Sequence, residues 1–228
     1  TGEIPSDYNF LTQHQMGGVS EFIARLSKAK GPFFTVSTAC STSAKAFASA
    51  SNLIHLNICD AVIVGGVDTL CHLTLNGFRA LELLSNGVSN PFSLNRDGLN
   101  IGEGAALFVL EKTSGTINLC GVGESCDAYH ASAPDPTGEG AIASMENALE
   151  SALLKPDEIG YLNLHGTGTL LNDMMEAKAV DTLFNGVPCS SVKPLIGHCL
   201  GAAGAMETGV CWLMLNTEPQ LSLQVVSV

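Results

Sequence analysis

The chain is 228 residues long, which is enough to bury one sizeable hydrophobic core or two smaller ones. Apolar residues make up 46% of it and charged residues only 14%, so we expect a large core, an extensive oligomer interface, or both. The formal net charge of -12 argues against nucleic acids and anionic membrane surfaces as partners. No apolar run is long enough to cross a bilayer and no signal peptide is evident, so we expect no membrane insertion.

The eight cysteines mostly stand alone in apolar surroundings, without a Cys-x-x-Cys pair. This usage is typical of reduced thiols, so we expect a cytoplasmic protein rather than a secreted disulfide scaffold. A metal site built from Cys126, His130 or Cys199 would have a spacing that matches no zinc pattern. We therefore expect no metal site.

The first half of the chain alternates between expected helices and strands. A polar connector over 1–15 leads into a helix over 16–28, in which Phe22, Ile23 and Leu26 share one face. The elements that follow are a short buried strand over 33–36, a helix over 41–56, a buried strand over 61–67, a helix over 74–84 and a strand over 105–111. The run over 61–67 is apolar without alternation, which is typical of strands in parallel sheets.

The second half repeats the same alternation. Its expected elements are a strand over 116–122, a helix over 137–154, a strand over 159–164, a helix over 173–184, a helix over 201–216 and a strand over 220–228. Strands that alternate with helices predict an α/β protein. Two similar halves can be distinguished, and we place their boundary between residues 112 and 113.

Cys40 lies where the expected strand over 33–36 gives way to the helix that begins at Ser41. Unpaired backbone N–H groups and the positive end of the helix dipole stabilise an anion at such a junction. For a cysteine that anion is the thiolate, so this placement predicts a lowered pKa and a nucleophilic sulfur. The alternative is a small buried cysteine that packs behind a helix.

Two histidines downstream each lie in a loop at the end of an apolar segment. His165 stands inside the sequence Leu-His-Gly-Thr-Gly-Thr, and His198 follows Lys-Pro-Leu-Ile-Gly and precedes a small-residue helix. One nucleophile with two loop histidines is a reasonable constellation for acyl transfer. For His198 the alternative role is to satisfy the end of the helix that follows.

The blocks 38–41, 165–169 and 193–204 together resemble the three signatures of β-ketoacyl-[acyl carrier protein] synthases, the condensing enzymes of the thiolase superfamily. Supporting blocks match at 64–68, 90–98 and 127–130, the last favouring the type II branch or a related polyene-type ketosynthase. The resemblance runs from about residue 31 to residue 215. It implies the layered αβαβα thiolase fold, here incomplete.

The resemblance also implies roles for four residues. Cys40 attacks an acyl thioester carried on the phosphopantetheine of an acyl carrier protein, and no separate cofactor is bound. His165 and His198 stabilise the enolate that forms when a malonyl thioester loses carbon dioxide. Lys193 has an electrostatic or orienting role, and its carboxylate partner is either Glu207 or Glu176, because a lysine in so apolar a surround needs one.

Other residues have weaker assignments. Thr167 and Thr169 either bond the amides of the pantetheine arm or cap their own loop. Asp173 supports the site from the first turn of a helix, where a carboxylate is favourable in any case. His130 lies either near the pocket or in an exposed loop.

The sequence also departs from the family pattern. Leu170 stands where a proline is common, and Ile196 where a threonine often precedes the Gly-His pair; both changes bear on the shape of the pocket. Family members are considerably longer, with an N-terminal region and a C-terminal Gly-Phe-Gly-Gly loop that this sequence lacks. We therefore expect it to be a piece of a longer enzyme, inactive when isolated.

Three functional hypotheses follow, in order of preference. The first is a 3-oxoacyl-[acyl carrier protein] synthase that performs decarboxylative Claisen condensation in fatty acid or polyketide synthesis. The second is a catalytically silent paralogue or a partner subunit like a chain length factor, and the third is a thiolase, which normally needs a second catalytic cysteine. The expected partners are an acyl carrier protein and a second ketosynthase chain, identical or related, contacted partly through the strand beside Cys40.

Overall fold

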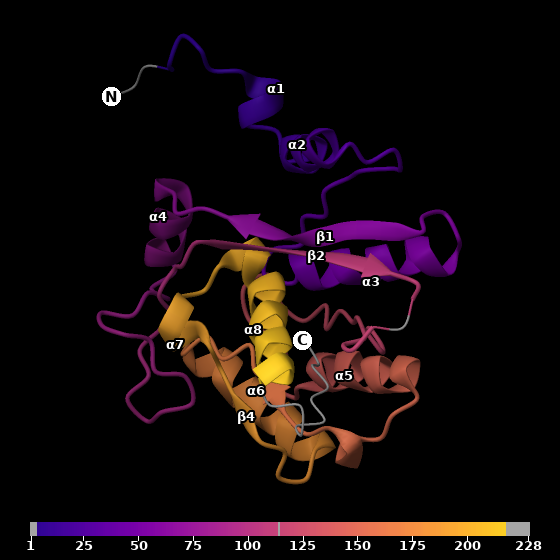
Figure 1. Ribbon diagram of the computed structural model, residues 1–228. Coiled ribbons are helices and arrows are strands. Elements are labelled where there is room, and N and C mark those ends of the chain that lie inside the picture. The colour runs from indigo at the N-terminus through magenta and orange to yellow at the C-terminus, as the bar shows by residue number, and fades with distance from the viewer. Residues whose placement is uncertain (1–3, 114, 218–228) are drawn as a thin grey trace.

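The computed structural model describes residues 4–113 and 115–217, and its elements are arranged in layers (Figure 1). The elements in chain order are α1 Phe10–Gln13, α2 Gly17–Ser27, α3 Thr42–His55, β1 Ala61–Asp68, α4 His72–Ala80, β2 Gly104–Glu111, α5 Glu139–Ala152, β3 Leu162–Asn163, α6 Leu170–Leu183, β4 Cys189–Ser190, α7 Lys193–Ile196 and α8 Ala203–Thr217, with 3-10 turns at Pro156–Glu158 and Leu200–Ala202. Helices α3 and α8 lie between the β1–β2 sheet and the part of the molecule that holds β3, β4, α5 and α6. This order reproduces the layered α/β arrangement expected from the sequence.

Strands β1 and β2 pair antiparallel, from Ala61 opposite Glu111 to Asp68 opposite Gly104. The expectation of a fully buried, parallel-type strand over 61–67 is therefore wrong. Ile63 and Val67 of this strand are 39% and 44% exposed, because within the described residues only one face of the sheet is covered by helices.

The central helices pack on the covered face of this sheet. Phe47 of α3 meets Phe108 of β2 edge to face, with ring centroids 5.3 Å apart, and the other buried residues of this cluster are Ala50, Val64 and Ala205. Alanine and serine on α3 let α8 approach closely, so the N-terminus of α3 and the start of α8 lie side by side. Cys40 lies just before α3, and His198 lies in the turn before α8.

A second core forms in the C-terminal half. Met145 and Leu149 of α5 pack with Leu162 of β3, Ala179 of α6 and Phe184. The short strands β3 and β4 pair in parallel, Leu162 opposite Cys189. This core supports the loop that begins at His165, directly after β3.

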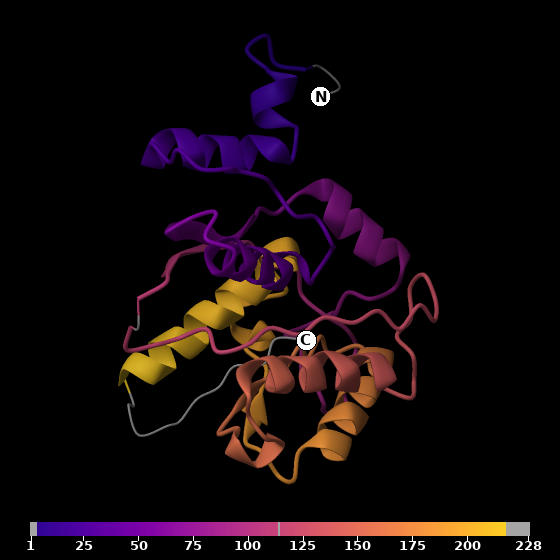
Figure 2. The same cartoon turned by 90° about the vertical axis from the view of Figure 1, so that its right-hand side faces the viewer.

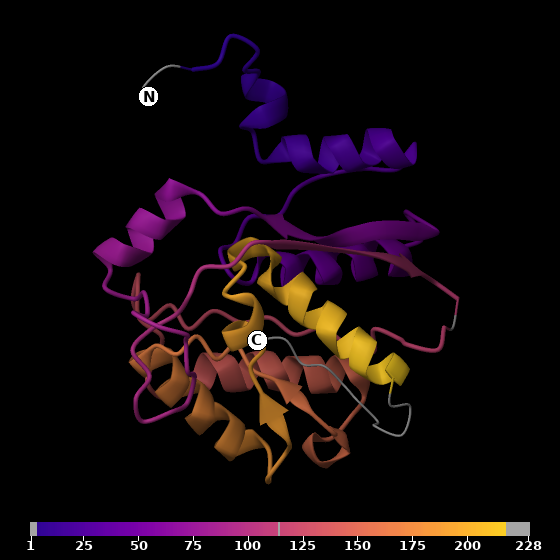
Figure 3. The same ribbon diagram turned by 60° about the vertical axis from the view of Figure 1, so that its left-hand side comes forward.

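The N-terminal arm is formed by residues 4–36, and its helices α1 and α2 stand apart from these layers in two further views (Figures 2 and 3). Its helix α2 confirms the helix expected over 16–28, and α1 interrupts the expected connector. The buried strand expected over 33–36 is wrong: the segment is assigned to no strand, and Phe33 and Phe34 are 55% and 53% exposed. A strand needs a neighbour to pair with and a layer to cover it, and no described residue supplies either here.

The remaining expectations divide between helices and strands. Helices α3, α5 and α8 lie within two residues of their expected bounds, α4 lies at 72–80, and α6 begins three residues early at Leu170. The strand expected over 116–122 is irregular in its described residues, and the one over 159–164 shrinks to β3. The strand expected over 220–228 lies outside the described residues. No helix in the described part of the chain is long and apolar enough to cross a membrane.

Candidate active site

Cys40 is presented by a tight turn directly before α3. Ala39 takes a left-handed backbone conformation with φ of 53°, and Thr42 closes the turn by accepting from the Thr38 N–H at 2.9 Å and donating to the Ala39 carbonyl at 2.6 Å. A non-glycine residue with this φ is uncommon, and its strain is retained where neighbouring bonds hold it. The turn aims the sulfur toward α8 and the His198 loop.

His198 faces that sulfur. Its Nε2 lies 2.9 Å from the Cys40 Sγ, and the residue is 1% exposed. Its backbone is fixed on both sides, because its N–H donates to the Asn100 carbonyl at 2.7 Å and its carbonyl accepts from Gly102 at 3.0 Å. Gly102 is required there, since a Cβ would lie 2.3 Å from the Ile196 oxygen.

His165 lies on the other side of His198, with the two ring centroids 5.2 Å apart and the planes at 88°. Its loop is anchored by Glu176 of α6, whose carboxylate accepts from the backbone N–H of His165 at 2.6 Å and of Gly166 at 2.8 Å. Glu176 is therefore a loop anchor, and the alternative in which it holds Lys193 is wrong.

Lys193 is 2% exposed and makes its ion pair with Glu207 of α8 at 2.5 Å. Its Nζ also lies 3.4 Å from Nδ1 of His165. An ammonium group only donates, so Nδ1 accepts and the proton of a neutral His165 ring is on Nε2. The chain Glu207–Lys193–His165 thus fixes one tautomer of the histidine.

The other sequence-predicted residues lie at varying distances from this cluster. Asp173 is 1% exposed and ties two loops together, because it accepts from the backbone of Phe92 at 2.7 Å and of Gly168 at 3.1 Å. The hydroxyls of Thr167 and Thr169 bond one another at 2.8 Å, which is loop capping. His130 is exposed, bonds Ser132, and is not brought to the cluster.

Two family models match the chain almost end to end: the N-terminal domain of beta-ketoacyl synthases over residues 2–115 and the C-terminal domain over residues 117–221. The chain belongs to the β-ketoacyl synthase family. A curated relative, the 3-oxoacyl-[acyl-carrier-protein] synthase 2 of Coxiella burnetii, is 38% identical over 211 residues, covering 83% of this chain and 51% of the relative. The chain thus spans about half the length of the relatives it matches.

Solved structures give the same assignment. A ketosynthase in complex with its chain length factor from Xenorhabdus doucetiae is 50% identical, with a TM-score of 0.90 over 92% of this chain and 53% of that one. A β-ketoacyl synthase from Burkholderia phymatum is 30% identical, with a TM-score of 0.84 over 92% of this chain and 55% of that one. These likenesses confirm the thiolase-like layered α/β fold.

Burial sets the protonation states of Cys40, His165 and His198. It lowers the pKa of His165 well below its usual range and that of His198 to about 3, with the Lys193 charge acting in the same direction. Both rings are therefore neutral near pH 7. Burial also raises the pKa of the Cys40 thiol, and Lys193 only partly opposes it. The expected lowering at the helix N-terminus is wrong, because desolvation of the thiolate outweighs the favourable field.

A neutral thiol beside a neutral imidazole still makes a reactive pair. Nε2 of His198 can accept the proton of Cys40 as the sulfur attacks, so the nucleophile is activated by a base at contact distance rather than stored as a thiolate. Nδ1 of the same ring is buried without a partner among the described residues. The ring is consequently held by its backbone and by packing.

The ligand atoms of Cys40, His165 and His198 lie within 4.8 Å of one another, a spacing that would also suit a metal ion. The Lys193 ammonium, 3.4 Å from Nδ1 of His165, opposes a second cation there. The cluster is thus better suited to developing negative charge than to a metal. Neither Cys126 nor His130 belongs to any such cluster among the described residues.

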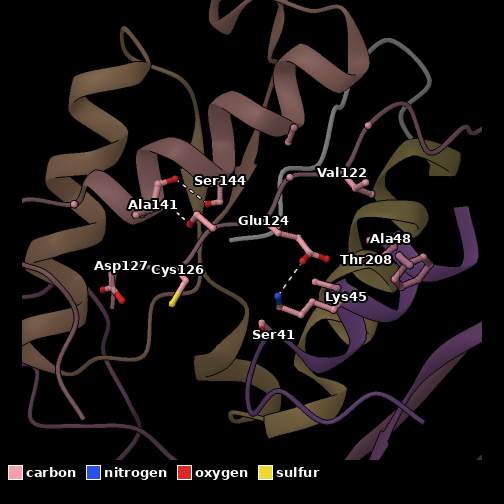
Figure 4. Close-up of a pocket in the computed structure, with 18 of the residues that line it drawn as sticks. Ser41, Lys45, Ala48, Val122, Glu124, Cys126, Asp127, Ala141, Ser144 and Thr208 are labelled. Carbon is pink, nitrogen blue, oxygen red and sulfur yellow. Dashed lines mark hydrogen bonds and ion pairs between the residues drawn. The ribbon is translucent and has the colours of Figure 1, made fainter. Parts of the chain in front are cut away.

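A pocket of about 390 Å³ lies between α3, the segment over 119–127 and α5. Figure 4 shows Lys45 and Glu124 pointing toward one another in it, and their ion pair measures 2.9 Å. None of Cys40, His165 and His198 lines this pocket. The reacting groups therefore lie outside it.

Two polar residues that the sequence reading did not single out hold the His198 turn. Ser43 of α3 and Asp68 of β1 both bond the Gly201 backbone. Asp68 ends the family-like block over 64–68, which is the one sequence signal that pointed to it. Ser43 carried no separate signal, because serine is ordinary in a small-residue helix.

Proposed function

We propose that this chain carries the condensing site of a 3-oxoacyl-[acyl carrier protein] synthase. The observation that carries the proposal is the 2.9 Å contact between Cys40 Sγ and His198 Nε2, backed by His165, Lys193 and Glu207. In the first half-reaction Cys40 attacks the acyl thioester. Its proton passes to His198 and then to the departing phosphopantetheine thiol, which leaves the acyl group on sulfur.

In the second half-reaction a malonyl thioester loses carbon dioxide, and the electron pair of the broken bond forms an enolate. Nε2–H of His165, with its tautomer fixed by Lys193, donates to the enolate oxygen. The enolate carbon then attacks the acyl carbonyl, a new carbon–carbon bond forms, and the Cys40 thiolate leaves. The product is a 3-oxoacyl thioester two carbons longer.

We propose an acyl carrier protein and a second ketosynthase-like chain as partners. A solved relative is a type II polyketide acyl-carrier protein in complex with its ketosynthase, and another is a ketosynthase with its chain length factor. The exposed Phe22, Phe33 and Phe34 of the arm support a chain–chain contact in this region. Eight free cysteines support a reducing, cytoplasmic location.

We also propose that the two halves meet near residues 112 and 113. The boundary between the two family matches, at residues 115 and 117, supports this division. The nucleophile then comes from the first half, and His165, Lys193 and His198 come from the second. The site is complete only where the two halves pack together.

The test is acylation of the full-length protein by an acyl thioester of an acyl carrier protein, followed by mass spectrometry of its peptides. Label should appear on Cys40 and disappear in Cys40→Ala, while the exposed-cysteine control Cys71→Ala keeps it. Condensation with malonyl thioester should require the same sulfur. Persistence of acylation in Cys40→Ala would overturn the mechanism, and lack of acylation in the unsubstituted protein would favour the silent-paralogue hypothesis.

A further inference from the structure

The peptide group of Gly201 lies in the turn that joins His198 to α8, and side chains from two other elements hold it. Asp68, at the end of β1, accepts from the Gly201 N–H at 3.0 Å. Ser43, in the first turn of α3, donates to the Gly201 carbonyl at 2.7 Å. The Ser43 oxygen also accepts from the Ala205 N–H at 2.9 Å, so the hydroxyl joins both ends of the turn. We call these contacts the Gly201 clamp.

The clamp depends on a close approach between β1 and this turn. A Cβ on Gly66 would lie 2.8 Å from the Ala202 Cα and 3.0 Å from the Ser43 Cβ. Only glycine therefore allows the strand to lie directly on the turn while Ser43 stays in contact with it. Ser43 is fully buried, at 0% exposure, so its hydroxyl has no access to water as a substitute partner.

The turn is strained as well as crowded. Leu200, between His198 and Gly201, has a φ of 47°, a left-handed conformation that is unfavourable for a non-glycine residue. Such a conformation persists only where surrounding contacts hold it. The Gly201 clamp bonds both the backbone N–H and the backbone carbonyl of Gly201, the residue after Leu200.

The position of the clamp connects it to the reacting atoms. Ser43 is three residues after Cys40, and Gly201 is three residues after His198. We propose that Ser43 and Asp68 are positioning residues, which act through the Gly201 backbone to set the contact between Cys40 Sγ and His198 Nε2. This inference rests on the proposed function only in taking those two side chains as the reacting pair.

The test compares steady-state kinetics of the full-length protein with those of Ser43→Ala, Asp68→Ala and Asp68→Asn. The amide side chain of the last variant keeps an oxygen that accepts from Gly201 but removes the charge. We expect kcat to fall about tenfold to a hundredfold in both alanine variants with KM within about twofold, since small displacements of a reacting group have effects of this size. Asp68→Asn should keep kcat within about threefold of the unsubstituted protein.

Matched controls separate positioning from general damage. Ser49→Ala removes a hydroxyl from the same helix that bonds only its own helix, at the Lys45 carbonyl, and Asp60→Ala removes an exposed carboxylate just before β1. Both should keep kcat. The rate at which iodoacetamide alkylates Cys40, measured across pH, should fall in the alanine variants and not in the controls.

Three outcomes would overturn the inference: alanine variants that match the controls in kcat and alkylation, equal losses in Asp68→Asn and Asp68→Ala, or a kcat loss matched by the unfolded fraction in circular dichroism. If Ser43→Ala does not fold, the comparison of Asp68→Ala with Asp68→Asn tests the inference, because Asp68 is partly exposed and its substitution is better tolerated. Acylation of Cys40 in the unsubstituted protein is measured in the same samples, so failure of the proposed function is seen separately.

Discussion

The candidate active site and the N-terminal arm differ in which side chains they bury: the site buries charged groups, and the arm exposes apolar ones. In the site, Lys193, Glu207, Asp173 and Glu176 are buried, and each has a charged or backbone partner. In the arm, α1 and α2 bury none of their residues, although they carry several large apolar side chains. A buried charge is costly unless it is paired, and exposed apolar surface is costly unless it is covered. The site's charges are thus satisfied within this chain, whereas the arm has the composition of an interface.

The largest expected effect comes from breaking an ion pair in each region. Glu207→Gln leaves the buried Lys193 ammonium without its counter-charge and should lower the free energy of unfolding by about 3–5 kcal/mol. Glu21→Gln breaks the exposed Arg25–Glu21 pair on α2 and should leave it unchanged within error. Urea unfolding measures both. Equal losses would mean that the arm is as well packed as the site.

Truncating one phenylalanine in each region gives an effect of similar size. Phe47 is 6% exposed and packs on Phe108, so Phe47→Ala should cost about 3–5 kcal/mol through lost burial and a cavity. Phe22 is 62% exposed on α2, so Phe22→Ala should change the unfolding of an isolated chain little while weakening its association with a second chain. Analytical ultracentrifugation at matched concentration measures the association of Phe22→Ala with a second chain. A destabilised monomer with unchanged association would contradict the comparison.

The sequence predicted the helices of both regions better than the strands. Helical signals belong to the segment itself, so α2 and α3 could be located from residue spacing, α5 from the Lys-Pro pair that ends it and α8 from its small and apolar composition. A strand depends on a neighbour that spacing does not reveal. Segments 33–36 and 116–122 have strand-like composition without a described partner, and the antiparallel pairing of β1 with β2 has no local signature.

The candidate site divides along a similar line. Motifs pointed to Cys40, His165, Lys193 and His198, and the structure brings these four together. The choice between Glu207 and Glu176 needed three-dimensional reach, because both lie on helices that follow a site loop. The sequence predicts a lowered pKa for the Cys40 thiol, whereas burial raises it. A helix N-terminus can be inferred from sequence, but desolvation by segments distant in the chain cannot.

A smaller effect follows from the neutral histidines of the site. His198 has an ordinary pKa of 6.5 when unfolded and of about 3 when folded, so below pH 6.5 only the unfolded state takes up the proton. Stability is therefore full above pH 6.5 and should fall by about 2 kcal/mol between pH 6.5 and pH 5 from this group alone. Burial raises the pKa values of Glu207 and Glu176, which opposes the trend by favouring folding at low pH.

His198→Asn isolates the contribution of the ring, because both glutamates and His165 remain. Its urea midpoint should depend less on pH between 7 and 5 than that of the unsubstituted protein. No such substitution is available in the arm's helices, which contain no histidine between Phe10 and Gln13 or between Gly17 and Ser27. Identical pH profiles for the two proteins would show that His198 titrates normally when folded.

The smallest effect tests whether the arm unfolds with the rest of the chain. Lys28 at the end of α2 and Leu153 at the end of α5 both adopt left-handed backbone conformations, with φ of 59° and 58°. Glycine accepts this conformation without steric cost, so Leu153→Gly, at a side chain 91% exposed, should stabilise the chain by about 0.5–1 kcal/mol. Lys28→Gly makes the same local improvement, but it should leave the global urea midpoint unchanged because the arm contributes little to the cooperative core. A matching rise in both variants would mean that the arm folds as part of that core and that its apolar face is supported without a second chain.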